Sequence, residues 1–201
     1  MPDFTTAPAL ITLWAVIGYL LGSIPFGLLL AKAMGLGNLR DIGSGNIGAT
    51  NVLRTGSKKA AALTLLLDGG KGALAVLLAR TLAGDDAAQI AGLMAFIGHC
   101  FPVWLRFRGG KGVATFLGLL LALSWPVGLA ACATWLFLAA TLRISSLAAL
   151  FAAGSCTIWM LLFNQGQYYF LGIWLTALIV FTHRANLARL RAGTEPRIGQ
   201  K

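Results

Sequence analysis

The residues best suited to chemistry lie in two glycine-rich stretches that also hold cations. Gly109–Gly112 reads GGKG and follows Arg108, and Asp41–Arg54 reads DIGSGNIGATNVLR. Glycines let backbone N–H groups approach a ligand closely, and Lys and Arg supply positive charge to an anion. This combination indicates binding of a phosphate or a similar small anion. A glycine-rich loop with a purely structural role is the alternative for Asp41–Arg54.

The side chains within these stretches define the candidate binding residues. In Asp41–Arg54, short hydroxyl and amide side chains alternate with the glycines, and a guanidinium can donate hydrogen bonds to two oxygens at once. Gly109–Gly112 is followed by an apolar segment, and the N-terminus of a helix there would add partial positive charge. For Arg108 and Lys111, contact with lipid headgroups is the alternative. The candidates are Gly43, Ser44, Gly45, Asn46, Thr50, Asn51, Arg54, Arg108, Gly109, Gly110, Lys111 and Gly112.

Neither a nucleotide nor a metal ion is expected at these stretches. GGKG does not fit the G-x-x-x-x-G-K-[S/T] pattern of nucleotide-binding loops, which argues against an ATPase. Cys100, Cys132 and Cys156 lie within or beside apolar runs and lack metal-ligand spacing. We expect them to be buried thiols, and we expect no metal and no cofactor.

The two histidines have different expected roles. His99 stands close to Pro102 at a helix end, where a structural hydrogen bond is the usual role. His183 and Asn186 are spaced to share one face of a helix just after the last apolar segment, and both are candidates for the site. Ser145 lies in another polar turn, where its hydroxyl would either bind substrate or cap the next helix.

The composition places most of the chain in a membrane. Hydrophobic residues make up 58% of the 201 residues, charged residues make up 11%, and the mean hydropathy is +0.79. A soluble core of this size needs less apolar surface, so lipid must cover much of it. The 16 Lys and Arg, against 6 Asp and Glu, fall between apolar segments as in cytoplasmic loops, which argues against nucleic-acid binding. We therefore expect an all-α polytopic membrane protein.

The apolar segments predict seven transmembrane helices. The first, from about 10 to 34, contains Pro25 and is expected to be kinked. Residues 113–142 are too long for one crossing and are interrupted at 124–126, so two spans are expected there, the first of them short. The other predicted spans are 60–82, 87–105, 147–163 and 168–182.

The basic residues predict the orientation of these spans. Lys and Arg gather in or beside one alternating set of connections, with Lys71 and Arg80 as exceptions. The positive-inside rule then places the N-terminus outside, the C-terminus inside and the glycine-rich loops in the cytoplasm. Lys71 also follows Asp68 by three residues within an apolar segment, where an ion pair must face protein or water; we count Lys71 as a candidate for substrate binding. Residues 1–201 are expected to form one membrane-embedded domain with a flexible tail from about 191.

Five motifs, in this order and spacing, make the chain resemble a known family. They are GSIPFG from Gly22, GSGNIGATNVLR from Gly43, LDGGKG from Leu67, GHCFPVWLRFRGGKGVAT from Gly98 and HRANLARL from His183. On these motifs the chain resembles the bacterial membrane glycerol-3-phosphate acyltransferases that use acyl phosphate, the PlsY family. The resemblance runs from about residue 19 to residue 190.

The resemblance implies transfer of a fatty acyl group from acyl phosphate to the 1-hydroxyl of sn-glycerol 3-phosphate. The products would be lysophosphatidic acid and phosphate, at the first step of phospholipid synthesis, in the bacterial inner membrane with the site facing the cytoplasm. Ser44 and Arg54 match an essential serine and arginine of the family, and Gly109–Gly112 matches its glycerol-phosphate loop. The family's last motif is His-Arg-Glu-Asn, so His183 and Asn186 match while Ala185 replaces the glutamate.

The residue inventory also constrains the mechanism. Scarce carboxylates and the lack of a Ser-His-Asp arrangement in the loops argue against a covalent acyl-enzyme. We expect direct attack of the glycerol hydroxyl on the acyl carbonyl, with His183 or a phosphate oxygen of the donor as the base. The expected catalytic residues are Ser44, Arg54, Lys111, His183 and Asn186.

Two other classes of protein fit parts of the pattern. A transporter or flippase for phosphorylated small molecules also uses broken helices and anion-facing helix ends, although no inverted repeat is evident beyond a short GGKG echo. A structural lipid-binding protein would use the loops only on headgroups. The expected partners are acyl phosphate, glycerol 3-phosphate and membrane lipids, with no nucleic acid, no obligate protein partner and a monomeric chain.

Overall fold

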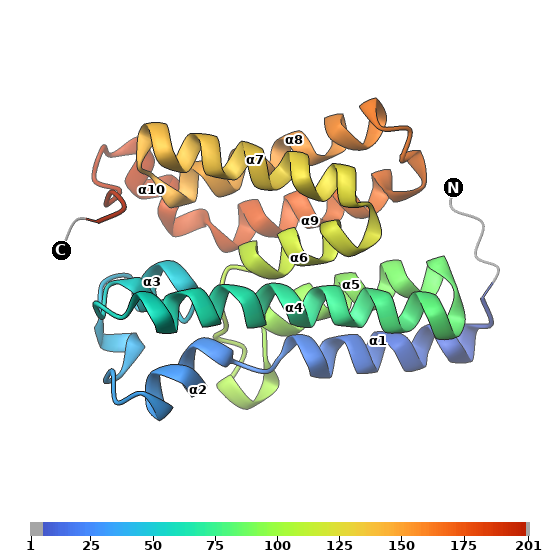
Figure 1. Ribbon diagram of the computed structural model, residues 1–201, viewed down its shortest axis with the longest axis horizontal. Coiled ribbons are helices and arrows are strands. Elements are labelled where there is room, and N and C mark those ends of the chain that lie inside the picture. The colour runs from blue at the N-terminus through green and yellow to red at the C-terminus, as the bar shows by residue number, and fades with distance from the viewer. Residues whose placement is uncertain (1–5, 200–201) are drawn as a thin grey trace. The chain divides into compact units, whose positions relative to one another are not determined.

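The computed structural model describes residues 6–199, and helices are the only regular secondary structure within that range (Figure 1). The chain forms two compact units that meet in sequence between Leu123 and Ser124. The all-α prediction is therefore confirmed for the described residues.

Within residues 6–123, the first unit contains six α-helices and two short 3-10 helices. The break between its first two helices spans Ser23 to Pro25, where proline lacks the N–H that would continue the helix. The predicted kink in the first span is confirmed. The elements are α1 (Pro8–Gly22), α2 (Phe26–Ala33), η1 (Leu39–Asp41), α3 (Ala49–Leu53), α4 (Lys58–Ala83), α5 (Asp85–Cys100), η2 (Val103–Leu105) and α6 (Val113–Leu123).

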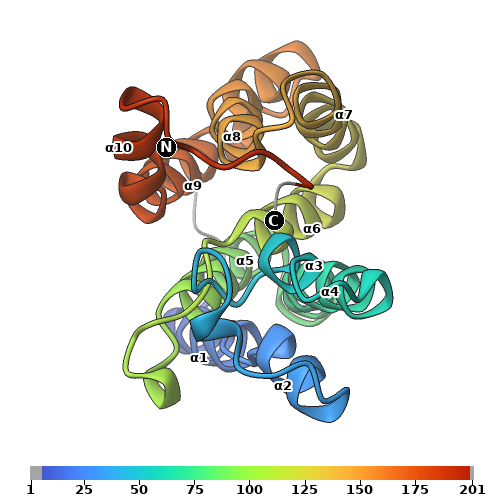
Figure 2. The ribbon, with the colours of Figure 1, turned by 90° about the vertical axis from the view of Figure 1, so that its left-hand side faces the viewer.

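Glycines bring the helices of this unit close together. A methyl group on Gly22 of α1 would overlap the backbone of Ala95 on α5, and one on Gly118 of α6 would overlap the backbone of Gly69 on α4. Small residues at such contacts let helix backbones approach within a membrane, where packing rather than the hydrophobic effect drives association. As a result α4 and α5 lie between α1 on one side and α6 on the other (Figure 2).

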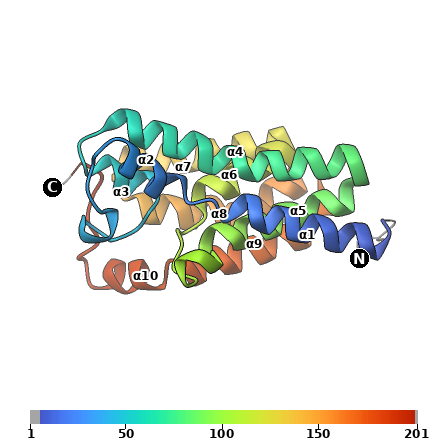
Figure 3. The same ribbon diagram turned by 90° about the horizontal axis from the view of Figure 1, so that it is seen from below.

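Within residues 124–199, the second unit contains four α-helices and one short 3-10 helix, and helices that follow one another in sequence pack against one another. Its α8 packs against both α7 and α9. Thr176 on α9 donates a hydrogen bond of 2.8 Å to the carbonyl oxygen of Ala153 on α8. After α9 the chain bends by 63° into the last helix (Figure 3). The elements are α7 (Trp125–Leu142), α8 (Ser145–Leu162), η3 (Gly166–Tyr168), α9 (Tyr169–Thr182) and α10 (Arg184–Arg191).

The helices have the length and surface that a bilayer requires. Within the described residues, five helical segments are long and apolar enough to cross a membrane, and six if the bent pair Gly166–Thr182 and Arg184–Arg191 counts as one. Large apolar side chains stay exposed along them, such as Leu66 and Trp125 at 68% each, which lipid tolerates and water does not. Residues 113–142 form a short helix and a longer one, and the predicted break lies at Ser124. Only the longer helix is among the candidate spans, so the described residues hold five or six candidate spans against the seven predicted. The five segments are Pro8–Ala33, Lys58–Ala83, Asp85–Leu105, Trp125–Leu142 and Ser145–Leu162.

Candidate functional site

The loop before α3 is organised by the side chain of Asn51, which is buried. Its amide nitrogen donates to the carbonyl oxygens of Leu39 (3.0 Å) and Asn46 (2.7 Å). Its amide oxygen accepts from the backbone N–H of Ser44 (3.1 Å) and lies 3.3 Å from the Ser44 hydroxyl. Asn51 was predicted to bind substrate, and in this structure both ends of its amide serve the loop. The Ser44 side chain, in contrast, is exposed.

Arg54 lies against the same loop from the C-terminal end of α3. A methyl group on Gly43 would come within 2.5 Å of Cδ and Nη1 of Arg54 and within 2.8 Å of the Asn51 oxygen. Gly43 (φ +53°) and Gly45 (φ +67°) also adopt left-handed backbone conformations that glycine tolerates best. Glycine is therefore needed on both sides of Ser44, and the Arg54 side chain lies against Gly43, the residue before that serine. Asn46 is half-buried and Thr50 is exposed on the same loop.

Arg40, which sequence reasoning did not select, connects the two glycine-rich stretches. Its Nη1 donates to the carbonyl oxygen of Gly45 (3.1 Å), and its Nη2 donates to the carbonyl oxygen of Arg108. Burial and, to a lesser degree, the positive charge of Arg108 lower the pKa of Arg40. Two guanidinium groups are thus close enough to repel each other, an arrangement that an anion would stabilise. The sequence signal was present as a basic residue just before the glycine-rich stretch.

The GGKG stretch sits directly on the C-terminal end of α5. The backbone N–H groups of Gly109 and Gly110 donate to the carbonyl oxygens of Cys100 and His99, each at 3.0 Å. These two amides were expected to face an anion, and they are bonded to α5 instead. Lys111 is half-buried, and Gly112 has a left-handed φ of +85° immediately before α6 begins.

A buried ionic cluster lies in the helices beside this stretch. Lys71 Nζ is 2.9 Å from Asp68 Oδ1, so the pair predicted from the sequence is present. His99 Nδ1 is 3.6 Å from the same Asp68 oxygen, and Lys71 Nζ also donates to the carbonyl oxygen of Ile24 at 2.8 Å. Lys71 is only 5% exposed. Lys71 was predicted to bind substrate, and in this structure the partners of its ammonium group are atoms of the protein itself.

In the second unit, His183 and Asn186 lie at the bend between α9 and α10, and both are buried. His183 Nδ1 is 2.8 Å from the carbonyl oxygen of Ile179. Because a carbonyl can only accept, this contact requires the proton on Nδ1. Ser145 is the first residue of α8. The hydroxyl of the next residue, Ser146, donates a hydrogen bond to Glu195 in the tail.

Glu195 supplies a carboxylate to Asn186, although the sequence has Ala185 where the family pattern has glutamate. Its Oε1 accepts from Asn186 Nδ2 (2.5 Å) and Ser146 Oγ (2.7 Å), and its Oε2 accepts from Arg189 Nε (2.7 Å). Burial raises the pKa of Glu195, but these hydrogen bonds and the charge of Arg189 outweigh burial, so the net pKa lies below its usual value. This carboxylate lies in the tail that was predicted to be flexible.

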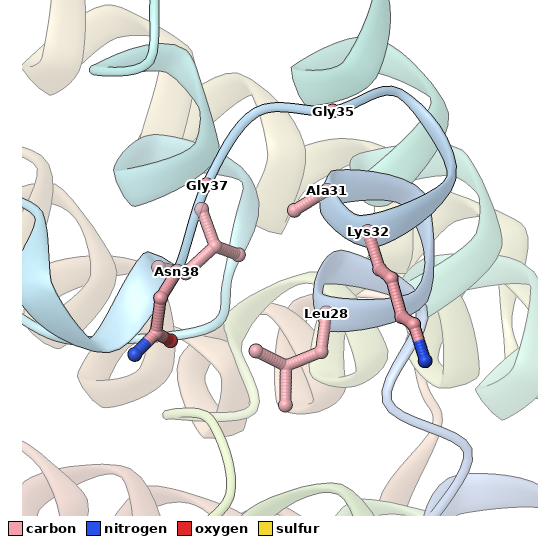
Figure 4. Close-up of a pocket in the computed structure, with 7 residues that line it drawn as sticks. Leu28, Ala31, Lys32, Gly35, Gly37 and Asn38 are labelled. Carbon is pink, nitrogen blue, oxygen red and sulfur yellow. The ribbon is translucent and has the colours of Figure 1, made fainter.

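A pocket lies apart from these residues. It has a volume of about 440 Å³ and lies between α2 and the residues leading into η1 (Figure 4). Lys32 and Asn38 stand on opposite sides of it, with Leu28 and Ala31 between them. None of the predicted site residues lines it. Within residues 6–199 no group of three or more His, Cys, Asp or Glu is placed to hold a metal ion.

The whole chain can be compared with known proteins. Residues 12–193 match the family model described as glycerol-3-phosphate acyltransferase. The chain belongs to the glycerol-3-phosphate acyltransferase family. Curated members include the glycerol-3-phosphate acyltransferases of Ruegeria pomeroyi, 68% identical, and Dinoroseobacter shibae, 65% identical, each aligned over the full chain and 99% of the relative.

Solved structures of the family agree with the fold described above. A crystal structure of PlsY (YgiH), an integral membrane glycerol 3-phosphate acyltransferase in its glycerol 3-phosphate form, is 40% identical. The alignment covers 94% of this chain and 96% of that one, with a TM-score of 0.87. The lysophosphatidic acid form is 37% identical, with a TM-score of 0.85 and coverage of 94% and 95%. The chain is thus a multi-pass integral membrane protein of this enzyme family.

Proposed function

We propose that the protein transfers a fatty acyl group from acyl phosphate to the 1-hydroxyl of sn-glycerol 3-phosphate. The products are lysophosphatidic acid and inorganic phosphate. The observation that carries the proposal is the connection made by Arg40, which bonds the carbonyl oxygens of Gly45 and Arg108 and so joins the two stretches that the sequence marks for anion binding. Related crystal structures in glycerol 3-phosphate and lysophosphatidic acid forms support the choice of acceptor and product.

The charges of these stretches suit two phosphate-bearing substrates. Arg54, Arg108 and Lys111 provide cations; the carboxylate of Asp41 accepts a hydrogen bond of 2.8 Å from Asn38, and that of Asp68 is paired with Lys71. Cations fixed beforehand stabilise the charge that develops on the leaving phosphate and on the carbonyl oxygen. In this scheme Arg54 and Lys111 bind phosphate groups, and exposed Ser44 and Thr50 donate to substrate oxygens.

The proposed chemistry is direct transfer without an acyl-enzyme. The glycerol O1 attacks the acyl carbonyl carbon, the bond from that carbon to the phosphate oxygen breaks, and the hydroxyl proton passes to the departing phosphate. In the first unit the Ser44 hydroxyl has an amide, Asn51, as its neighbour rather than a base that could activate it as a nucleophile. His183, with its proton placed on Nδ1, is the alternative base.

The proposed membrane arrangement has seven spans, with the N-terminus outside and the C-terminus inside. The five long segments are joined by Gly166–Thr182 and by the short α6. The loops before α3 and before α6 then face the cytoplasm of a bacterial inner membrane, where soluble glycerol 3-phosphate arrives from one side and the acyl donor from the lipid. We propose that the chain acts as one monomeric domain without a metal.

The test is an assay of the purified protein in detergent with acyl phosphate and radiolabelled glycerol 3-phosphate, with chelator present. We expect labelled lysophosphatidic acid from acyl phosphate and none from acyl-CoA or acyl carrier protein. Micelles have no compartments, so product formation identifies an acyltransferase rather than a transporter. Absence of product from acyl phosphate, or a stable acyl adduct on Ser44 found by mass spectrometry, would contradict the proposal.

A matched pair of substitutions tests the site itself. Lys111→Ala removes a proposed phosphate ligand, whereas Lys59→Ala removes an exposed cation from the first turn of α4. We expect Lys111→Ala to lower kcat/KM by roughly ten- to a hundredfold, because a charged hydrogen bond to substrate contributes roughly 1.5–3 kcal/mol. Lys59→Ala should behave as the unsubstituted protein, and equal effects of the two would remove Lys111 from the site.

A further inference from the structure

The first two glycines of GGKG leave room for residues of α5, a role that is separate from binding an anion. A methyl group on Gly110 would overlap the imidazole ring of His99, and one on Gly109 would overlap the carbonyl oxygen of His99. Both glycines also donate their N–H groups to carbonyls at the end of α5. The backbone at these two positions therefore faces protein, and glycine is needed for contact with α5 rather than with a ligand.

The His99 ring is buried beneath this loop. It is 4% exposed, and its Nδ1 lies 3.6 Å from Asp68 Oδ1. Asp68 is fixed in turn by Lys71 at 2.9 Å, and its backbone carbonyl accepts a 2.8 Å hydrogen bond from Thr115 near the start of α6. Lys71 reaches the carbonyl oxygen of Ile24 at the break after α1. One cluster thus ties α5 to α4, to the break between α1 and α2, and to the helix that follows GGKG.

The charges of this cluster are already matched within the protein. Asp68 and Lys71 form a neutral pair in which each side chain is 3% exposed. The Lys71 ammonium has a carboxylate and a carbonyl oxygen as partners, so a substrate phosphate would have to compete with both. These contacts favour a supporting role for Lys71 over the substrate-binding role that its charge suggested.

We propose that His99 is a positioning residue for the reaction: its buried ring, next to Asp68, is the surface on which Gly110 rests, its backbone carbonyl meets Gly109, and it thereby sets the place of Lys111. His99 touches the loop and not the substrate. The inference rests on the proposed function only in requiring that Lys111 binds a phosphate-bearing substrate.

Combining substitutions at Gly110 and His99 tests the contact between them, because the second substitution should partly restore the kcat/KM that the first one lowers. Gly110→Ala should lower kcat/KM because the new methyl group displaces the ring and the loop. Adding His99→Ala removes the ring, so the double variant should recover at least about tenfold over Gly110→Ala alone. If Gly110 were needed for close approach of the substrate, removing His99 would give no recovery, and that result would overturn the proposal.

Gly109→Ala is the matched control. Its methyl group would meet a backbone carbonyl oxygen, which remains when the His99 side chain is removed. We therefore expect no recovery when His99→Ala is added to Gly109→Ala. Recovery at both glycines would point to general loosening of the loop and would refute the specific contact.

A second cycle, between His99 and Lys111, separates positioning from stability. If His99 acts through Lys111, His99→Ala should lower kcat/KM in the unsubstituted protein and have little further effect in Lys111→Ala. Effects that multiply would show that His99 does not act through Lys111.

Melting temperatures of all variants are measured in parallel, with His99→Ser as a second variant that lacks the ring. Gly110→Ala should gain thermal stability when either His99→Ala or His99→Ser is added. That thermal coupling is measurable even if acyl phosphate proves not to be the donor, so failure of the proposed function and failure of this inference give different results.

Discussion

Replacing Lys71 with methionine should destabilise the first unit strongly, because it leaves Asp68 as a buried charge. The two side chains are each 3% exposed and their charged atoms are 2.9 Å apart. Once the ammonium is gone, His99 Nδ1, at 3.6 Å, is the nearest ionisable partner of that carboxylate, and the hydrogen bond to Ile24 is lost as well. Methionine has nearly the length of lysine, so packing changes little and the electrostatic effect dominates.

The size of the effect follows from the burial of the pair. Removing one partner of a buried ion pair costs about 3–5 kcal/mol, whereas replacing both by uncharged groups is often close to neutral. For a chain of this size 1 kcal/mol shifts the melting temperature by roughly 2–4 °C, so Lys71→Met should lower it by roughly 6–20 °C. The double variant Asp68→Asn/Lys71→Met should recover most of that loss.

Thermal unfolding in one fixed detergent measures these shifts. Lys32→Met on α2 is the control, since Lys32 is exposed and a surface substitution changes stability by no more than about 0.5 kcal/mol. A Lys71→Met variant that melts with the control would refute the idea of a buried charge left unpaired. So would a double variant whose loss equals the sum of the two single losses.

Three further substitutions test other contacts. Glu195→Gln should lower the free energy of unfolding by about 1–3 kcal/mol at neutral pH. Because folding lowers the pKa of Glu195, the carboxylate stabilises the protein above its unfolded pKa, and this stabilisation disappears as the pH falls through the folded pKa. The melting curves of the two proteins should therefore converge in acid. Arg80→Met removes donors to the carbonyl oxygens of Ala122 (2.6 Å) and Leu123 (3.1 Å) and should lower the melting temperature, while unchanged melting would show that these carbonyls need no cap. Asn51→Leu should lower kcat by releasing the Ser44 loop, and a change in stability without any loss of turnover would contradict that role.

The helices and their breaks were predictable because they depend on local sequence. Proline at position 25 and the Ser124–Pro126 interruption end helices through their own backbone chemistry, and apolar length sets the spans. The pair of Asp68 and Lys71 was also predictable, because residues three apart on a helix face the same side.

The contacts that shape the candidate site were not predictable, because they join residues distant in sequence. Nothing local to His99 indicates that Asp68 lies beside it, and nothing local to Gly110 indicates that its missing side chain makes room for that histidine. Glu195 was missed for a related reason, since a polar tail after the last helix reads as flexible until its partners are known. The roles of the predicted catalytic residues stay predictions.

Arg80 differs in its contacts from the basic residues of the loops. Its guanidinium caps carbonyls at the end of the short α6 and pairs with Asp85 at 3.0 Å, just as Lys71 is matched to Asp68. These are the two basic residues that depart from the sorting of positive charge between loops. Since a bilayer penalises each unpaired carbonyl, a helix too short to reach polar surroundings needs donors brought to it. Buried Lys71 and half-buried Arg80 thus act as hydrogen-bond donors and ion-pair partners within the first unit rather than as topological signals. Substitutions at either should lower the stability of the chain without reversing its orientation in the membrane.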